Sequence, residues 1–386
     1  MAEPGFRARL TPATALVARL ARSRATPFYL FERGTARASL RRWRKAAGPA
    51  DGVALFYPWK CNRHGGLVDL ARSEGYGAEV TAGEDLVAAL RDDRSGSRVI
   101  FQGPVKSPAA LDAALAAGAW LVADSVEDAA AILDRAGALR LSPRYLLRFR
   151  PASSEPSQRG FGLTARGVAA FGARAVRERR PLPEGLAFHL GTGLASPAPF
   201  AAAIREAGRL AEALARLGVA VRVLDVGGGF PALREARRDA RGRIRSRAAS
   251  PEAFLRAIRA EARRAVPGAR LFLEPGRAVA SDAFHLVTRV VRTTERRVYV
   301  DASRMAHAFF VPRGSHPFRA VPRRAGRGAV EVRGPLPTNL DLFAERVPIG
   351  RPRPGDLLVI ESVGAYNLIT ANAWSGAVPE VVEAEG

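Results

Sequence analysis

The sequence predicts an α/β fold in which a barrel of parallel strands, surrounded by helices, is joined to a mostly-β C-terminal domain. Between about residues 53 and 273, short apolar runs of strand length alternate with alanine-rich stretches of helical spacing. From about residue 285 onward, strand-like runs follow one another through proline and glycine turns, without helices between them. Polar residues finish several of the earlier runs, and a (β/α)8 barrel gathers its chemistry at those strand ends.

The individual elements are expected in the following order. Residues 27–32 are predicted to form a strand, followed by an amphipathic helix over about 36–47. Barrel strands are expected at 53–57, 99–101, 120–123, 145–149, 186–188, 221–226 and 271–273, and helices at 84–92, 108–117, 126–136, 198–217 and 251–265. Later strands are expected at 287–291, 297–300, 330–332 and 357–360. Residues 232–250, rich in arginine and without apolar periodicity, are expected to form an exposed insertion.

The composition is that of a folded globular chain. Of 386 residues, 47% are apolar and 25% are charged, and no apolar run approaches the roughly 18 residues that a membrane span requires. The apolar stretch near the N-terminus is too short for a secretory signal, so a cytoplasmic location is expected. The single cysteine, Cys61, excludes an intrachain disulfide and a multi-cysteine metal cage, and we expect no metal site.

The net charge of +23 raises the question of nucleic-acid binding. The arginines are scattered, no aromatic-rich RNA-binding signature accompanies them, and the only lysines are Lys45, Lys60 and Lys106. So strong a preference for arginine indicates coding bias as much as selection for a partner. We therefore expect no nucleic-acid function, and either a field that attracts anionic substrates or acidic proteins or a merely solvated surface.

Three segments at strand ends carry candidate chemistry. Lys60 follows a strand and has aromatic neighbours, which could desolvate its amine for Schiff-base chemistry. The run 227–229 is Gly-Gly-Gly, whose backbone N–H groups could approach a phosphate. Glu274 and Arg277 place an acid at a strand end and a guanidinium suited to a phosphate close behind it. Taken one at a time, a solvated lysine, a tight turn and a surface ion pair explain these segments equally well.

Five ordered motifs, taken together, change this assessment. They are Tyr-Pro-Trp-Lys-Cys-Asn at 57–62, Phe-His-Leu-Gly-Thr-Gly at 188–193, Asp-Val-Gly-Gly-Gly-Phe-Pro at 225–231, Glu-Pro-Gly-Arg at 274–277 and Gly-Ala-Tyr at 364–366. With them the chain resembles the fold-type III pyridoxal-phosphate decarboxylases, which include ornithine, arginine and diaminopimelate decarboxylases, from about residue 27 to 376. The resemblance implies a pyridoxal 5'-phosphate-binding (β/α)8 TIM barrel at 31–282, with residues 1–30 joining the β domain at 283–386. It also implies a homodimer whose active sites lie between subunits.

The resemblance also implies a role for each matching residue. Lys60 would hold the cofactor covalently, His189 would stack on its ring, and Glu274 would face the pyridine nitrogen, where a carboxylate keeps that nitrogen protonated. Tyr366 would reach the phosphate from the partner subunit. The other residues expected to contact the cofactor are Glu79, Arg148, Thr192, Gly227, Gly228, Gly229, Gly276 and Arg277.

Two departures from the family pattern bear on the substrate. Family members carry a cysteine followed by an acid in a Gly-Pro loop, and this chain has Pro337 and Thr338 at those positions, ahead of Asp341. Ornithine enzymes have an acid near the position of Arg313, where an arginine would repel a terminal ammonium group. Arg313, Thr338 and Asp341 are accordingly the expected substrate contacts, unless Arg313 points into solvent or the alignment slips.

The expected activity is removal of the α-carboxylate from an amino acid or amino-acid conjugate, in a biosynthetic pathway and with pyridoxal phosphate as cofactor. The departures predict an anionic or carrier-bound substrate in place of a simple diamino acid. One alternative is an amino-acid racemase or epimerase on the same fold, although alanine-type racemases pair the pyridine nitrogen with arginine where this chain has Glu274. The other is a non-catalytic pyridoxal-phosphate-binding protein, which is usually a lone barrel without a C-terminal domain.

Overall fold

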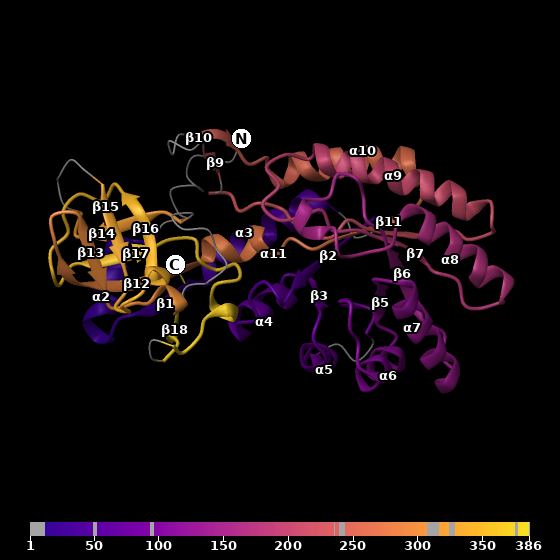
Figure 1. The fold of residues 1–386 in the computed structure, drawn as a ribbon, viewed down its shortest axis with the longest axis horizontal. Helices are drawn as coiled ribbons and strands as arrows, with labels where there is room; N and C mark the ends of the chain where they lie inside the picture. Colours follow the sequence, from indigo (N-terminus) through magenta and orange to yellow (C-terminus); the bar gives the residue numbers. More distant parts are fainter. Residues whose placement is uncertain are drawn as a thin grey trace.

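The computed structural model consists of a barrel unit and a β unit that lie at opposite ends of the molecule (Figure 1). It describes residues 12–48, 52–92, 96–234, 236–238, 244–306, 316–323, 329–374 and 377–385. The predicted fold class is confirmed, because a closed parallel barrel is joined to a separate, mostly antiparallel sheet.

Eight strands close the barrel in the order β11-β2-β3-β4-β5-β6-β7-β8, each parallel to its neighbours. They are β2 (Val53–Pro58), β3 (Gly77–Val80), β4 (Val99–Phe101), β5 (Trp120–Ala123), β6 (Arg144–Arg148), β7 (Gly185–Ala187), β8 (Val223–Asp225) and β11 (Arg270–Leu273). A cluster of buried strand residues fills the barrel, with the Phe272 ring 4.9 Å from Phe56 and 5.1 Å from Trp120 between ring centroids. The barrel is therefore a packed core, and its chemistry is confined to its ends.

Helices surround the barrel (Figure 1). They are α3 (Arg33–Ala47), α4 (Gly65–Ser73), α5 (Gly83–Asp92), α6 (Pro108–Ala117), α7 (Val126–Leu139), α8 (Ala165–Arg177), α9 (Ala198–Ala215) and α10 (Pro251–Ala265). Serine or threonine side chains cap several N-termini, as Ser107 does for α6 and Ser250 for α10, each followed by a proline in the first turn. Within the described residues, no helix is long and apolar enough to cross a membrane.

The β unit contains strands from both ends of the chain. β12 (Phe284–Thr293) pairs with β1 (Phe28–Glu32), β13 (Arg297–Val300) and β17 (Leu357–Ile360). The sheet also contains β14 (Phe318–Val321), β15 (Val330–Arg333), β16 (Leu342–Val347) and β18 (Val381–Ala384), and β18 lies parallel to β1. The short helix α2 (Thr14–Ser23) packs Val17 and Ala21 on the same apolar cluster as Phe28 and Val287.

The arginine-rich segment at 232–250 contains a hairpin that periodicity did not predict. β9 (Ala236–Arg238) pairs antiparallel with β10 (Ile244–Arg247), and residues 235 and 239–243 lie outside the described residues. Next to the hairpin, the Arg234 guanidinium donates to Glu361 at 2.6 Å. The segment is therefore tied to the β unit at its start.

Candidate active site

Polar side chains from all eight barrel strands meet at one end of the barrel, because the carboxyl ends of parallel strands lie at the same rim. The residues at or just after the strand ends are Lys60, Glu79, Gln102, Asp124, Arg148, His189, Asp225 and Glu274. The sequence analysis had singled out most of this set, and the fold brings them together.

Lys60 lies between two buried carboxylates. Its Nζ donates to Oε2 of Glu79, on β3, and lies 4.0 Å from Oε2 of Glu274. Burial lowers the pKa of Lys60, but the charges of Glu79 and Glu274 outweigh that effect and raise it overall. Oε1 of Glu79 is buried and has no hydrogen-bond partner among the described residues. A buried carboxylate with an unused acceptor is unfavourable by itself and is expected where a further group binds.

Glu274 belongs to a cluster of buried acids. Burial, followed by the charges of Asp225 and Glu79, raises the pKa of Glu274 well above its usual range. Burial also raises the pKa of Asp225 to about 7, although its Oδ1 accepts a hydrogen bond from the Gly227 N–H at 2.8 Å. The Gln102 amide donates to Oε1 of Glu274 at 2.9 Å and fixes the orientation of that carboxyl group. The site therefore holds more acid than its cations balance.

His189 is held as a neutral imidazole. Burial, together with the charges of Lys60 and Arg148, lowers its pKa to about 3. Its Nδ1 accepts a hydrogen bond from the Gly228 N–H at 3.3 Å, which places the remaining ring proton on Nε2. The neutral ring is thus fixed in one tautomer beside Lys60.

Residues that follow β7, β8 and β11, next to Asp225 and Glu274, form a cradle for an anion, which we call the anion cradle: Gly191, Thr192, Gly227–Gly229 and Arg277. Gly227 and Gly229 have φ angles of 66° and 90°, and a Cβ atom on Gly228 would lie 2.7 Å from the Glu274 carbonyl oxygen. Arg277 Nε donates to Thr192 Oγ1 at 3.0 Å. Gly227 and Gly228 already donate their N–H groups to Asp225 and His189, so the remaining backbone N–H groups and the Arg277 guanidinium are the donors that suit a phosphate.

Tyr366 lies in the site of its own chain, so the expectation that it reaches a partner's site is wrong. The Arg277 guanidinium lies 5.4 Å from the centroid of the Tyr366 ring, and the Tyr366 N–H donates to the Cys61 carbonyl at 2.8 Å. The Asn62 amide donates to the Gly364 carbonyl at 2.9 Å. These contacts fold the C-terminal segment back onto the barrel mouth and give Tyr366 a φ of 65°.

Sequence reasoning missed several of the supporting residues. Arg148 donates to Asp124 at 2.9 Å, and Asp124 also accepts from the Gly162 N–H at 3.3 Å. Asp124 and Gln102 directly follow predicted strands. The strand-end rule that singled out Lys60 would therefore have found both residues. Gly276, in contrast, was among the expected cofactor contacts, and an added Cβ there would run into the Pro58 ring.

The three expected substrate contacts, Arg313, Thr338 and Asp341, come from a part of the sequence distant from the strand ends, and they differ in what they contact. Asp341 is buried and accepts hydrogen bonds from Ser303 Oγ at 3.0 Å, the Arg304 N–H at 2.6 Å and the Leu336 N–H at 2.8 Å. Thr338 Oγ1 accepts from the Leu340 N–H. Arg313 lies outside the described residues.

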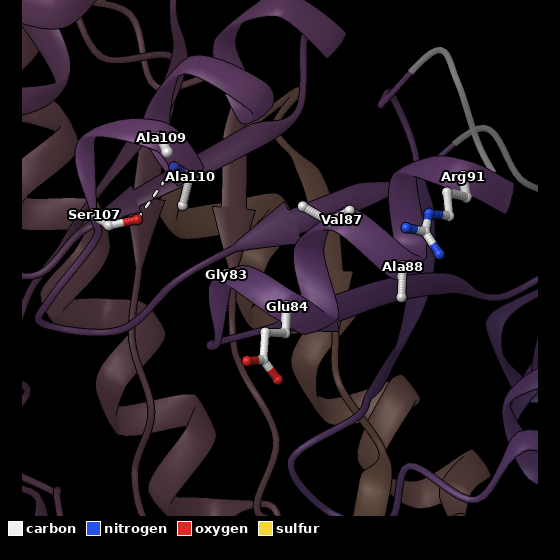
Figure 2. Close-up of a pocket in the computed structure, with 8 residues that line it drawn as sticks. All are labelled: Gly83, Glu84, Val87, Ala88, Arg91, Ser107, Ala109 and Ala110. Atoms are coloured by element: carbon white, nitrogen blue, oxygen red, sulfur yellow. Dashed lines mark hydrogen bonds between the residues drawn. The ribbon is translucent and has the colours of Figure 1, made fainter.

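A groove of about 540 Å³ lies on the outside of the barrel between α5 and α6 (Figure 2). It is lined mainly by small and apolar side chains, among them Val87, Ala88 and Ala110, with Glu84 and Arg91 as its charged members. Ser107 contributes through its cap on the Ala110 N–H (Figure 2). Because the lining residues come from surface helices and not from the strand ends, we assign the groove no catalytic role.

A barrel whose mouth holds a lysine among buried acids and an anion cradle beside them has the groups that a pyridoxal-phosphate enzyme needs. The chain belongs to the pyridoxal-dependent decarboxylases, and its residues 33–281 match the pyridoxal binding domain of that family. It is a pyridoxal-phosphate-dependent carboxy-lyase, as the sequence analysis predicted.

Named relatives and solved structures agree with this assignment. A diaminopimelate decarboxylase of Deinococcus radiodurans is 31% identical over 90% of this chain and 87% of its own length. An L-glutamyl-[BtrI acyl-carrier protein] decarboxylase of Niallia circulans is 25% identical over 89% of this chain and 84% of its own. The structure of a Helicobacter pylori diaminopimelate decarboxylase complexed with L-lysine has the same fold, with a TM-score of 0.83 and 22% identity over 95% of this chain and 93% of that one.

Proposed function

We propose that this enzyme decarboxylates an amino acid whose distal end carries a carboxylate or an acyl extension, in place of a simple diamino acid. The observation that carries this proposal is the loop at 334–341, in which Asp341 is the only acid. Both Asp341 oxygens accept hydrogen bonds from the protein itself. The loop therefore offers no carboxylate to a distal ammonium group, which would lose several kcal/mol if desolvated without a partner.

The residues that would hold the cofactor are those of the strand ends. Lys60 would carry it, the anion cradle with Tyr366 would bind its phosphate, and Glu274 would face the ring nitrogen. The buried, unsatisfied Glu79 Oε1 and the crowded glycines fit such an occupant. Pyridoxal phosphate supplies an electron sink for the bond that breaks at the substrate Cα.

The protein's own groups would perform the remaining steps. The ammonium of Lys60 gives up its proton to become a nucleophile, and Glu79, bonded to it, is the base within reach. The neutral His189 adds no positive charge to the site, so the electron-accepting character of the cofactor would depend on Glu274. Arg148, tied to Asp124 at the same rim, is a cation whose charge acts on both His189 and Lys60.

The relatives' names support a tail of this kind. Diaminopimelate ends in a carboxylate as well as an ammonium group, and an L-glutamyl carrier conjugate ends in an acyl link. Most of the relatives reported are diaminopimelate decarboxylases, so diaminopimelate is the diamino compound that the proposal has to accommodate. In both compounds the distal end differs from the lone ammonium group of ornithine or lysine: the first carries an added carboxylate, and the second carries a neutral acyl link.

The test measures CO2 release from a panel of amino acids: meso-diaminopimelate, ornithine, lysine, glutamate and a glutamyl thioester of pantetheine. We expect the highest kcat/KM with a substrate whose tail is anionic or acyl-extended. Efficient decarboxylation of ornithine or lysine would contradict the proposal.

A gain-of-function pair sharpens this test. Thr338→Asp restores a carboxylate to the loop and should raise kcat/KM for ornithine by about tenfold or more, since one hydrogen-bonded charge pair contributes about 1.4 kcal/mol or more. Thr338→Asn has the same size without the charge and should have no such effect. Equal effects of the two variants on kcat/KM would show that the loop does not contact the substrate.

We also propose that the active species is a homodimer in the cytoplasm, in which the 334–341 loop completes the partner's site. Mixing Lys60→Ala subunits with subunits that carry a disrupted 334–341 loop should restore activity in hybrid dimers. Sedimentation at assay concentrations should show a dimer, and an active monomer would refute this arrangement.

A further inference from the structure

The anion cradle already contains a carboxylate from the protein. Glu155 lies in the loop between β6 and α8, and its Oε2 accepts a hydrogen bond from the Thr192 N–H at 3.1 Å. The same oxygen lies against the Cα of Gly191, so closely that any Cβ there would collide with it. Gly191, with a φ of 144°, is therefore a glycine that makes room for a carboxylate.

The loop is built to deliver this side chain. The Glu155 N–H donates to the Leu190 carbonyl at 2.7 Å, which ties the loop to the strand end that carries the cradle. Earlier in the same loop, the Ala152 N–H donates to the Glu206 carboxylate at 3.1 Å. Glu155 itself is only half-buried, so its side chain has a path into solvent while its backbone stays anchored.

A phosphate and this carboxylate compete for one position. The Thr192 N–H has a single hydrogen to donate, and the hydroxyl of the same residue is bonded to Arg277. Two anions at hydrogen-bond distance from one N–H would repel each other, at a cost that grows as water is excluded. Occupation of the cradle by a phosphate therefore requires the Glu155 side chain to leave.

We propose that Glu155 is a built-in competitor for the cofactor phosphate, which fills the anion cradle in the cofactor-free enzyme and is displaced on loading. It keeps the Thr192 N–H satisfied before the cofactor arrives. It also sets the selectivity of the cradle, because only an anion that binds better than the carboxylate can enter. This inference rests on the cradle assignment proposed above and is independent of the substrate.

The test measures cofactor binding to the cofactor-free enzyme, by titration with pyridoxal phosphate and with pyridoxal, which lacks the phosphate. Glu155→Gln removes the competing charge and should lower the dissociation constant for pyridoxal phosphate by about tenfold, while leaving that for pyridoxal unchanged. Inorganic phosphate should likewise raise the melting temperature of the variant more than that of the wild type. An unchanged or weaker affinity for pyridoxal phosphate, or an equal gain for pyridoxal, would overturn the proposal.

Three further variants separate the possible failures. Glu206→Gln loosens the same loop without touching the cradle, and it should leave the dissociation constant for pyridoxal phosphate unchanged. Glu155→Ala provides a second removal of the charge should Glu155→Gln fold poorly, and it should strengthen binding in the same direction. Arg277→Ala should weaken binding of pyridoxal phosphate but not of pyridoxal. If Arg277→Ala has no such effect, the cradle assignment itself has failed, whatever Glu155 does.

Discussion

Replacing Asp225 by asparagine should stabilise the cofactor-free enzyme at alkaline pH. The carboxyl group is 1% exposed, so burial, and after it the charge of Glu79, disfavours its ionised form. Its pKa rises from 3.8 to about 7 in the folded chain. Asparagine keeps the acceptor for the Gly227 N–H without the charge.

The size of the effect follows from the pKa shift. Each pH unit between the unfolded and folded pKa corresponds to about 1.4 kcal/mol. Because the folded pKa is raised, the penalty is absent below pH 3.8, grows as the pH rises and is complete above about 7. Asp225→Asn should therefore raise the free energy of unfolding by about 4 kcal/mol at pH 8 and by about 1 kcal/mol at pH 4.5.

Urea unfolding of the cofactor-free protein at the two pH values measures both figures. The matched control is Asp124→Asn, since Asp124 is also buried at a strand end but is paired with Arg148 at 2.9 Å. Removing that partner should destabilise the protein by about 3 kcal/mol at pH 8. The reasoning is refuted if Asp225→Asn destabilises the protein at pH 8, or if its effect is the same at both pH values.

Three other predictions concern the same site. Lys60→Ala should abolish covalent cofactor attachment, measured by mass spectrometry after borohydride reduction, and a pyridoxyl group on Lys45 or Lys106 would contradict the assignment. The pKa of His189 is lowered to about 3 in the folded protein, so as the pH falls below 6.5 this histidine takes up a proton in the unfolded chain first. The free energy of unfolding should therefore drop by about 2 kcal/mol between pH 7 and 5, and His189→Gln should lose that part of the pH dependence. Since Tyr366 and Lys60 serve one chain's site, hybrids of Lys60→Ala and Tyr366→Ala subunits should show no complementation, and recovered activity would place Tyr366 across the interface.

The barrel could be predicted from sequence wherever a strand is an uninterrupted apolar run. The strand missed, β3 (Gly77–Val80), is four residues long and carries Glu79, which faces the barrel mouth, so its pattern is not that of a buried strand. Glu79 was nevertheless expected at the site, because the resemblance to the decarboxylase family includes it. At this strand, a charged residue at the barrel mouth interrupts the apolar pattern by which a buried strand is recognised in sequence.

The site could be predicted in its members but not in its contacts. Strand ends identify which side chains share the barrel mouth, whereas the distances that decide pKa values depend on packing. Tyr366 illustrates the limit, because nothing in Gly-Ala-Tyr tells whether the ring serves its own chain. That is decided by a φ of 65° and by the hydrogen bond from its N–H to the Cys61 carbonyl. The role of Asp341 could not be predicted from sequence either, since an aspartate in a loop can bind a substrate or accept hydrogen bonds from its own backbone.

Two sets of groups at the barrel mouth explain why one cofactor fits and why the site is costly without it. One set, the anion cradle, offers N–H groups and the Arg277 guanidinium to an anion, and the other set concentrates Glu79, Asp225 and Glu274 in a buried position. Each set also has a partner within the protein: Glu155 accepts a hydrogen bond from the Thr192 N–H in the first, and Lys60 partly neutralises the second. A molecule that carries both a phosphate and a protonated ring nitrogen would compensate both sets at once. Binding of pyridoxal phosphate should therefore stabilise the fold more than binding of pyridoxal does, because pyridoxal lacks the phosphate that displaces Glu155.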